Sequence, residues 1–118
     1  MSFKDLQVWE MSMDLVTDIY RVTEKFPQAE IYGLTSQMRR AAVSVPSNIA
    51  EGNGRGHSKE YLRFLYTARG SLMELMTQLE IAKRLDFIDE DSVNAIEEQC
   101  KRINMMLHKL IASIRSKT

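Results

Sequence analysis

The stretch VNAIEEQCKRINMMLHKLIASI, residues 93–114, decides the fold class of this chain. Apolar residues recur along it at alternating steps of three and four, without a break. That spacing places them on one stripe of an α-helix, whereas a strand would need alternation by two. The stripe consists of Val93, Ile96, Cys100, Ile103, Leu107, Leu110 and Ile114. The pattern predicts an amphipathic helix over about residues 90–116.

Two more helices follow from the same kind of spacing upstream. Residues 58–85 carry a second unbroken seam, made of Tyr61, Leu65, Ala68, Leu72, Leu75, Leu79 and Ala82. Residues 5–26 carry a shorter one, made of Leu6, Trp9, Met13, Val16 and Tyr20. Side chains that can accept a hydrogen bond from first-turn N–H groups stand at the start of these helices. We therefore predict Asp5, Ser58 and Asp89 as N-caps.

A fourth helix is predicted from Thr35, as its cap, to Gly52, as its end. Its apolar run contains Pro46, which lacks an N–H and leaves the carbonyl of Ala42 without a helical partner. We expect a kink there, with the hydroxyls of Ser44 and Ser47 in compensating positions. The chain shows no strand signal. The prediction is an all-α, antiparallel up-down four-helix bundle that forms a single domain over residues 1–118.

Composition sets the broad class of the protein. The 118 residues are 44% apolar and 27% charged, with a formal net charge of zero, which is ordinary for a globular protein. One cysteine excludes an internal disulfide. Acidic residues in the first 25 positions argue against a signal peptide, and no apolar run approaches the ~20 residues of a membrane span. We expect a cytoplasmic protein without membrane contact.

Apolar residues outside the seams need a partner. They are Leu15, Ile19, Val22, Phe26, Leu62, Tyr66, Met73, Met76, Met105, Met106 and Ile111. One interpretation is a core stripe wider than a strict seam. The other is a homo-oligomer that buries the surplus.

Charge is segregated along the chain although its sum is zero. Residues 35–69 carry six basic and two acidic side chains, and residues 86–98 carry six acidic and no basic ones. The basic segment includes the glycine loop at residues 52–56, where backbone N–H groups could approach an anion. Arginine also suits phosphate oxygens. Candidate phosphate contacts are Arg39, Arg40, Arg55, Lys59 and Arg63. The alternative is a solvated surface paired with the acidic segment.

No constellation for catalysis, a metal or a cofactor can be placed on this sequence, so we expect no enzyme and no cofactor. The glycine loop lacks the strand and the Gly-Lys-Ser/Thr run of nucleotide-binding loops. Cys100 lies in a seam and is predicted to be a core residue. A polar stripe remains, formed by Gln37, Arg40, Ser44, Ser47 and Glu51 with Asn48 at its border. It is a solvent face, a buried polar network, or the lining of a channel or ligand surface.

Three stretches resemble a known family. They are FKDLQVW at residues 3–9, GLTSQMRRAAVSVPSNIAEG at residues 33–52, and YLRFLYTARGSLMEL at residues 61–75. The chain is identified by them as similar to the four-helix-bundle family encoded in intervening sequences of bacterial large-subunit ribosomal RNA genes, whose members are often labelled ribosomal proteins. The family is in turn similar to the accessory protein of diversity-generating retroelements, a pentameric barrel that binds nucleic acid and partners a reverse transcriptase. The resemblance implies a homopentameric ring without enzymatic activity.

Together these observations predict a non-enzymatic homo-oligomer that binds RNA or DNA backbone or serves as a scaffold. The alternative is a ring that presents its polar stripe to a protein partner and does not contact nucleic acid.

Overall fold

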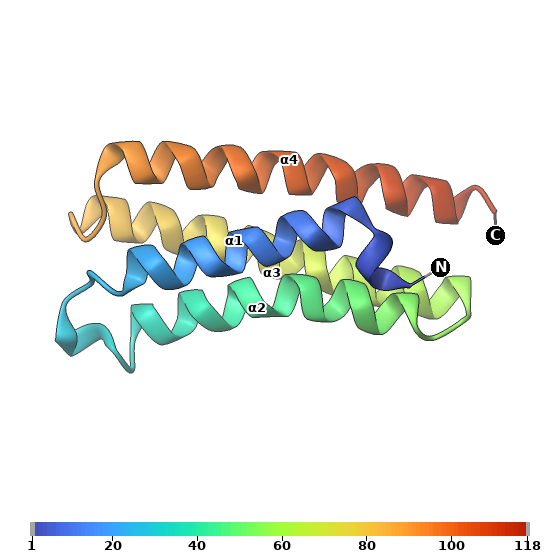
Figure 1. Cartoon of the computed structure of the whole chain (residues 1–118), viewed down its shortest axis with the longest axis horizontal. Coiled ribbons are helices and arrows are strands. Elements are labelled where there is room, and N and C mark those ends of the chain that lie inside the picture. Colours follow the sequence, from blue (N-terminus) through green and yellow to red (C-terminus); the bar gives the residue numbers. More distant parts are fainter. Residues whose placement is uncertain (1, 118) are drawn as a thin grey trace.

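The computed structural model describes residues 2–117 and shows a bundle of four antiparallel helices in that range. They are α1 (Gln7–Thr23), α2 (Leu34–Asn53), α3 (Ser58–Arg84) and α4 (Glu90–Arg115), with short 3-10 turns η1 (Phe3–Asp5) and η2 (Gln28–Glu30). Short connections join them into an elongated body of 46 × 24 × 20 Å (Figure 1). The all-α fold predicted from the sequence is confirmed, with no strand among the described residues.

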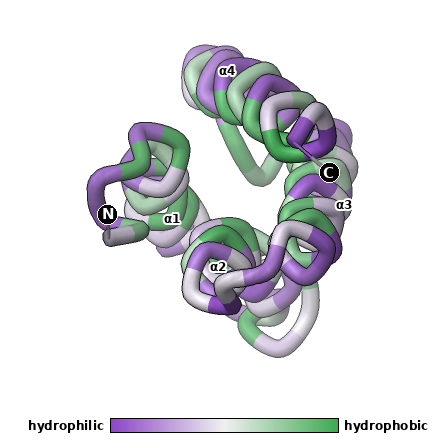
Figure 2. The backbone as a smooth tube through the Cα atoms, turned by 90° about the vertical axis from the view of Figure 1, so that its right-hand side faces the viewer, coloured by the Kyte–Doolittle hydropathy of each residue, from purple (hydrophilic) through white to green (hydrophobic). Residues whose placement is uncertain are grey.

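The helices follow one another around the bundle in chain order (Figure 2). The most extensive contact joins α2 to α3, and α1 packs on α2 and α4. The turn between α2 and α3 lies at the same end of the bundle as both chain termini (Figure 1). No described helix is both long and apolar enough to cross a bilayer.

The core confirms the predicted seams of α3 and α4. Twelve of their fourteen seam positions are buried, and Cys100 is among them. The seam predicted for α1 is wrong. Met13 and Tyr20 are 38% and 43% exposed, and the buried face instead consists of Val8, Ser12, Leu15, Ile19 and Thr23.

Two hydroxyl residues explain that error, because they interrupt the apolar pattern of the true core face of α1. Ser12 donates its hydroxyl to the carbonyl of Val8 at 2.7 Å, and Thr23 donates to the carbonyl of Ile19 at 2.6 Å. Each polar group is therefore satisfied within its own helix and can be buried at little cost.

Of the predicted helix caps, only Asp89 is confirmed. Its carboxylate accepts from the backbone N–H of Ser92 at 2.8 Å, and this bond lowers the pKa of Asp89. Asp5 instead completes a capping box with Ser2 in η1, and α3 begins after His57 without a side-chain cap. Thr35 is turned into the core, and Glu30 Oε1 accepts from the N–H of Leu34 at 3.0 Å.

The second helix does not end at Gly52, where the sequence predicts its end. It continues through the buried Pro46 and ends at Asn53, so Gly52 is a residue of the helix and not its end. The hydroxyl of Ser44 pairs with that of Ser71 in α3 at 2.8 Å. The amide of Asn48 donates to the Ser44 carbonyl at 2.8 Å.

Burial makes the Cys100 thiol unreactive. Desolvation, with a smaller contribution from the nearby Glu97 charge, raises its pKa to about 12. Since the thiolate is the nucleophile, we expect dithionitrobenzoate to leave native protein unlabelled at pH 8 and to label it stoichiometrically in guanidinium chloride. The raised pKa favours the folded state below the unfolded pKa of the thiol, near 9, and this contribution is lost as pH rises toward 12. Prompt labelling of the native protein would contradict this assignment.

Candidate nucleic-acid interface

Three of the five predicted phosphate contacts gather at the turn between α2 and α3. The guanidinium carbons of Arg55 and Arg63 lie 5.0 and 4.9 Å from the ring centre of Phe64. Lys59 is exposed in the first turn of α3, close to Arg55 and Arg63 in the chain. Gly56 adopts a φ of +77°, a left-handed conformation that favours glycine and brings the chain into α3. The turn thus presents cations around one aromatic ring.

Arg55 and Arg63 each already pair with a carboxylate three or four residues earlier in the chain. Arg55 pairs with Glu51 at 3.3 Å, and Arg63 contacts both oxygens of Glu60, at 3.1 and 3.2 Å. The hydrogen bond from Arg63 lowers the pKa of Glu60. These partners are exposed, and ion pairs of that kind contribute little to stability. Breaking either ion pair would therefore cost the bundle little stability.

Arg39 and Arg40 do not join this cluster. Arg39 donates to the hydroxyl of Thr23 at 2.9 Å and lies 4.6 Å from the ring centre of Tyr20, so it links α2 to α1. Arg40 lies on the other side of α2, in the groove that α2 forms with α3. Neighbouring residues of a helix point about 100° apart, which separates these two side chains.

Charge differs between the two ends of the bundle. Residues 101–118 carry five basic and no acidic side chains, and the C-terminal end of α4 lies at the same end of the bundle as the α2–α3 turn (Figure 1). The acidic residues 86–98 lie at the opposite end. The prediction that the basic segment pairs with residues 86–98 is therefore wrong for Arg55 and Arg63. Their partners are Glu51 and Glu60.

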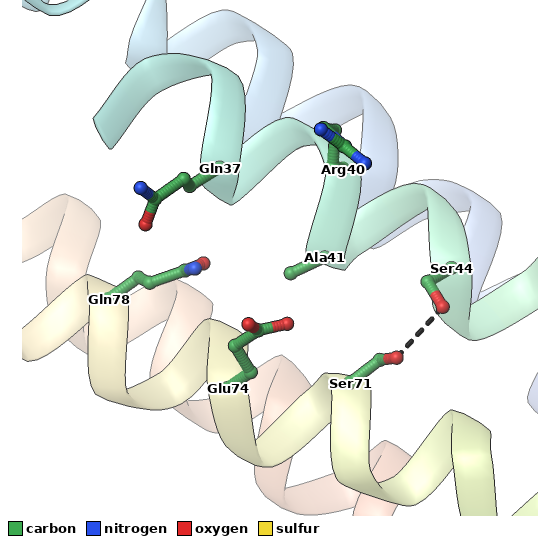
Figure 3. Close-up of a pocket in the computed structure, with 7 residues that line it drawn as sticks. All are labelled: Gln37, Arg40, Ala41, Ser44, Ser71, Glu74 and Gln78. Carbon is green, nitrogen blue, oxygen red and sulfur yellow. Dashed lines mark hydrogen bonds between the residues drawn. The ribbon is translucent and has the colours of Figure 1, made fainter. Parts of the chain in front are cut away.

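Part of the polar stripe of α2 lines a groove against α3. The groove has a volume of about 390 Å³ and is bounded by Gln37, Arg40, Ala41, Ser44, Ser71, Glu74 and Gln78 (Figure 3). Ser47 belongs elsewhere, in a pocket between α1 and α2. The stripe is therefore neither a purely solvent face nor a fully buried network. The residues that α3 contributes, Ser71, Glu74 and Gln78, were not identified from the sequence.

Two exposed apolar surfaces complete the outer face of the bundle. The first is the α1–α2 pocket, lined by Trp9, Met13, Val16, Val43, Pro46 and Ser47. The second is the outer face of α3, lined by Met73, Met76, Thr77, Glu80, Ile81 and Arg84. The predicted surplus residues divide between core and surface. Leu15, Ile19, Phe26 and Ile111 are buried, whereas Tyr66, Met73 and Met105 are exposed.

Between residues 2 and 117, no three His, Cys, Asp or Glu side chains gather where they could hold one metal ion. His57 and His108 both lie on the exposed surface.

The comparisons with known proteins agree with this architecture. The sequence profile of the 23S rRNA-intervening sequence protein family matches residues 4–109. A crystal structure of a protein of unknown function from the S23 ribosomal protein family of Bacteroides thetaiotaomicron has a TM-score of 0.79 and 20% sequence identity. The match covers 88% of this chain and 97% of that one. No curated protein matches the chain. The profile spans nearly the whole sequence, and the chain belongs to the 23S rRNA-intervening sequence protein family.

Proposed function

We propose that this protein is a non-enzymatic, cytoplasmic subunit of a homopentameric ring that binds RNA or DNA backbone at one end. The observation that carries the proposal is the convergence of Arg55 and Arg63 on Phe64 at the basic end of the bundle. Such a cluster offers charge for phosphates and guanidinium planes on which an unpaired base can stack.

The two apolar surfaces support assembly into a ring. The α1–α2 pocket and the outer face of α3 lie on different sides of the bundle, since α1 and α3 stand across the bundle from each other (Figure 2). If the α3 face of one copy covers the α1–α2 pocket of the next, the contact is head-to-tail. Repeated contacts of that kind close into a ring when the rotation permits. The ring would repeat each basic cluster around one rim.

Reversing the charge of this cluster tests the nucleic-acid interface. We expect the variant Arg55→Glu, Lys59→Glu, Arg63→Glu to bind labelled structured RNA and duplex DNA at least tenfold more weakly than the natural protein. For about six phosphate contacts, binding by the natural protein should weaken roughly a thousandfold between about 50 and 200 mM salt. The affinity of the variant should depend less steeply on the salt concentration. Fluorescence anisotropy at both salt concentrations measures these effects.

A matched control carries the same change of charge elsewhere. Arg21→Glu, Lys25→Glu, Lys83→Glu alters three exposed cations remote from the α2–α3 turn. It should reduce affinity much less than the cluster variant. Equal affinity for the cluster variant and the natural protein would refute the interface.

A protein adaptor is the second candidate, favoured by the carboxylates that already occupy Arg55 and Arg63. In this function, the ring presents the polar face of α2, from Gln37 to Glu51, to a protein and does not contact nucleic acid. Failure of the natural protein to bind either nucleic acid at low salt would favour it.

A further inference from the structure

We propose that the groove between α2 and α3 binds a small zwitterion of the α-amino acid class, with a short polar side chain. This site is separate from the basic cluster at the α2–α3 turn, and the inference does not depend on nucleic-acid binding. It rests on four polar side chains, Gln37, Arg40, Glu74 and Gln78, that line one groove.

Gln78 supplies the first argument. Its side chain lines the groove, the residue is only 6% exposed, and its Oε1 is buried without a hydrogen-bond partner. A buried carboxamide is stable when its oxygen accepts and its nitrogen donates. Rotation of the Gln78 carboxamide by 180° exchanges its oxygen and nitrogen and preserves its shape. Either atom can therefore face the groove. A ligand with both a donor and an acceptor would satisfy it.

The charges on the two walls supply the second argument. Arg40 extends from α2 and Glu74 from α3, and both are exposed and line the same groove (Figure 3). Among the described residues, neither side chain makes an ion pair within 4.0 Å. A guanidinium suits a carboxylate, which it can bind through two parallel hydrogen bonds. A carboxylate suits an ammonium group, and an α-amino acid carries both complementary charges.

The shape of the groove supports a ligand of that size. The small side chain of Ala41 leaves space between the two helices, and the Ser44–Ser71 hydrogen bond borders one part of the groove (Figure 3). Its volume of about 390 Å³ falls among those of small-molecule sites. The carboxamides of Gln37 and Gln78 lie beyond Arg40 and Glu74 from the two serines (Figure 3). They would face the polar side chain of the ligand.

Titration with three related compounds tests the chemistry. L-Glutamine, 4-aminobutanamide and glutaramic acid share the carboxamide, but the second lacks the carboxylate and the third lacks the ammonium group. We expect L-glutamine to bind with a dissociation constant on the order of 1 mM, as is reasonable for a ligand of this size in an open groove. Each analogue should bind at least tenfold more weakly. Chemical shifts of the backbone amides near Ala41 and Glu74 report binding to the natural full-length protein.

Variants locate the site. Arg40→Gln should weaken L-glutamine binding tenfold but leave 4-aminobutanamide binding unchanged, because that analogue has no carboxylate. Glu74→Gln should weaken L-glutamine binding but not glutaramic acid binding. Glu98→Gln, an exposed change on α4, is the matched control and should have no effect. Thermal unfolding verifies that each variant is folded.

Two results would overturn the proposal. One is the absence of shifts with L-glutamine and with each of the other polar amino acids at millimolar concentration. The other is equal binding of L-glutamine to Arg40→Gln, Glu74→Gln and the natural protein. A third outcome is also decisive. If dilution of the protein changes the chemical shifts of the backbone amides near the groove but added ligands do not, a second copy of the chain covers the groove. The small-molecule site is then refuted.

Discussion

Replacing Gly52 with alanine is expected to lower the free energy of unfolding by about 2 kcal/mol, the middle of the range for overpacked cores. A Cβ at this position would lie 2.8 Å from Phe64 Cβ, 3.0 Å from Tyr61 Cδ1 and 3.2 Å from the Tyr61 carbonyl oxygen. A Cβ and a carbonyl cannot swing aside as the end of a flexible side chain can. The two helices would have to separate where Gly52 of α2 meets Tyr61 and Phe64 of α3.

Gly70→Ala is the matched control, because it makes the same chemical change within α3 where no atom beyond the local helix backbone and the chain neighbours lies within 4 Å of the added Cβ. Alanine is favoured over glycine in a helix interior by about 1 kcal/mol, so this variant should be more stable than the natural protein. Urea unfolding followed by circular dichroism, at one fixed protein concentration, measures both. If Gly52→Ala were as stable as Gly70→Ala, close approach of α2 and α3 at Gly52 would be wrong.

Helix-scale periodicity was sufficient to predict α3 and α4 but not the orientation of α1. An unbroken seam identifies one face of a helix, and burial confirms it in α3 and α4. Helix α1 carries two apolar rows, one with Trp9 and Met13 and one with Leu15 and Ile19. Ser12 and Thr23 weaken the second row on any hydropathy scale, although it is the one that faces the core. Their hydrogen bonds to helix carbonyls are not visible in a pattern of polar and apolar letters.

Residue type alone also predicted the wrong start and end of α2, because contacts with other parts of the chain determine both. Glycine commonly follows the end of a helix, and this local preference predicts such a role for Gly52. In the structure it allows α2 to approach Tyr61 and Phe64, a requirement set by residues on another helix. Thr35 is a suitable cap by residue type, yet its side chain is buried and Glu30 bonds the first turn of α2.

The candidate interface was predictable in part. Arg55, Lys59 and Arg63 are near one another in the chain, so a turn and one helix start suffice to bring them together. The basic segment also points to Arg39 and Arg40, but the helix directs these two side chains toward different neighbours. Gln78 could not be identified because its importance depends on α2, which lies opposite it.

Assembly depends, in our proposal, on the apolar outer face of α3. Met73 and Ile81 are 41% and 43% exposed in the single subunit, so glutamate at either position can reach water without disturbing the core. In the ring, the same positions would face the apolar pocket between α1 and α2. A carboxylate placed there loses water and gains no partner, which costs several kcal/mol per charge. The bundle should therefore tolerate these changes, whereas the ring should not.

We accordingly expect the variant Met73→Glu, Ile81→Glu to be a folded monomer under conditions in which the natural protein is a pentamer. Native mass spectrometry and light scattering give the subunit number, and circular dichroism verifies the helical content. Asn94→Glu, Ala112→Glu adds the same charge at exposed positions of α4 and should remain pentameric. A variant that keeps the mass of the natural assembly would place the contact on another face. A monomeric natural protein would refute the ring itself, and the basic cluster would then act as a single copy.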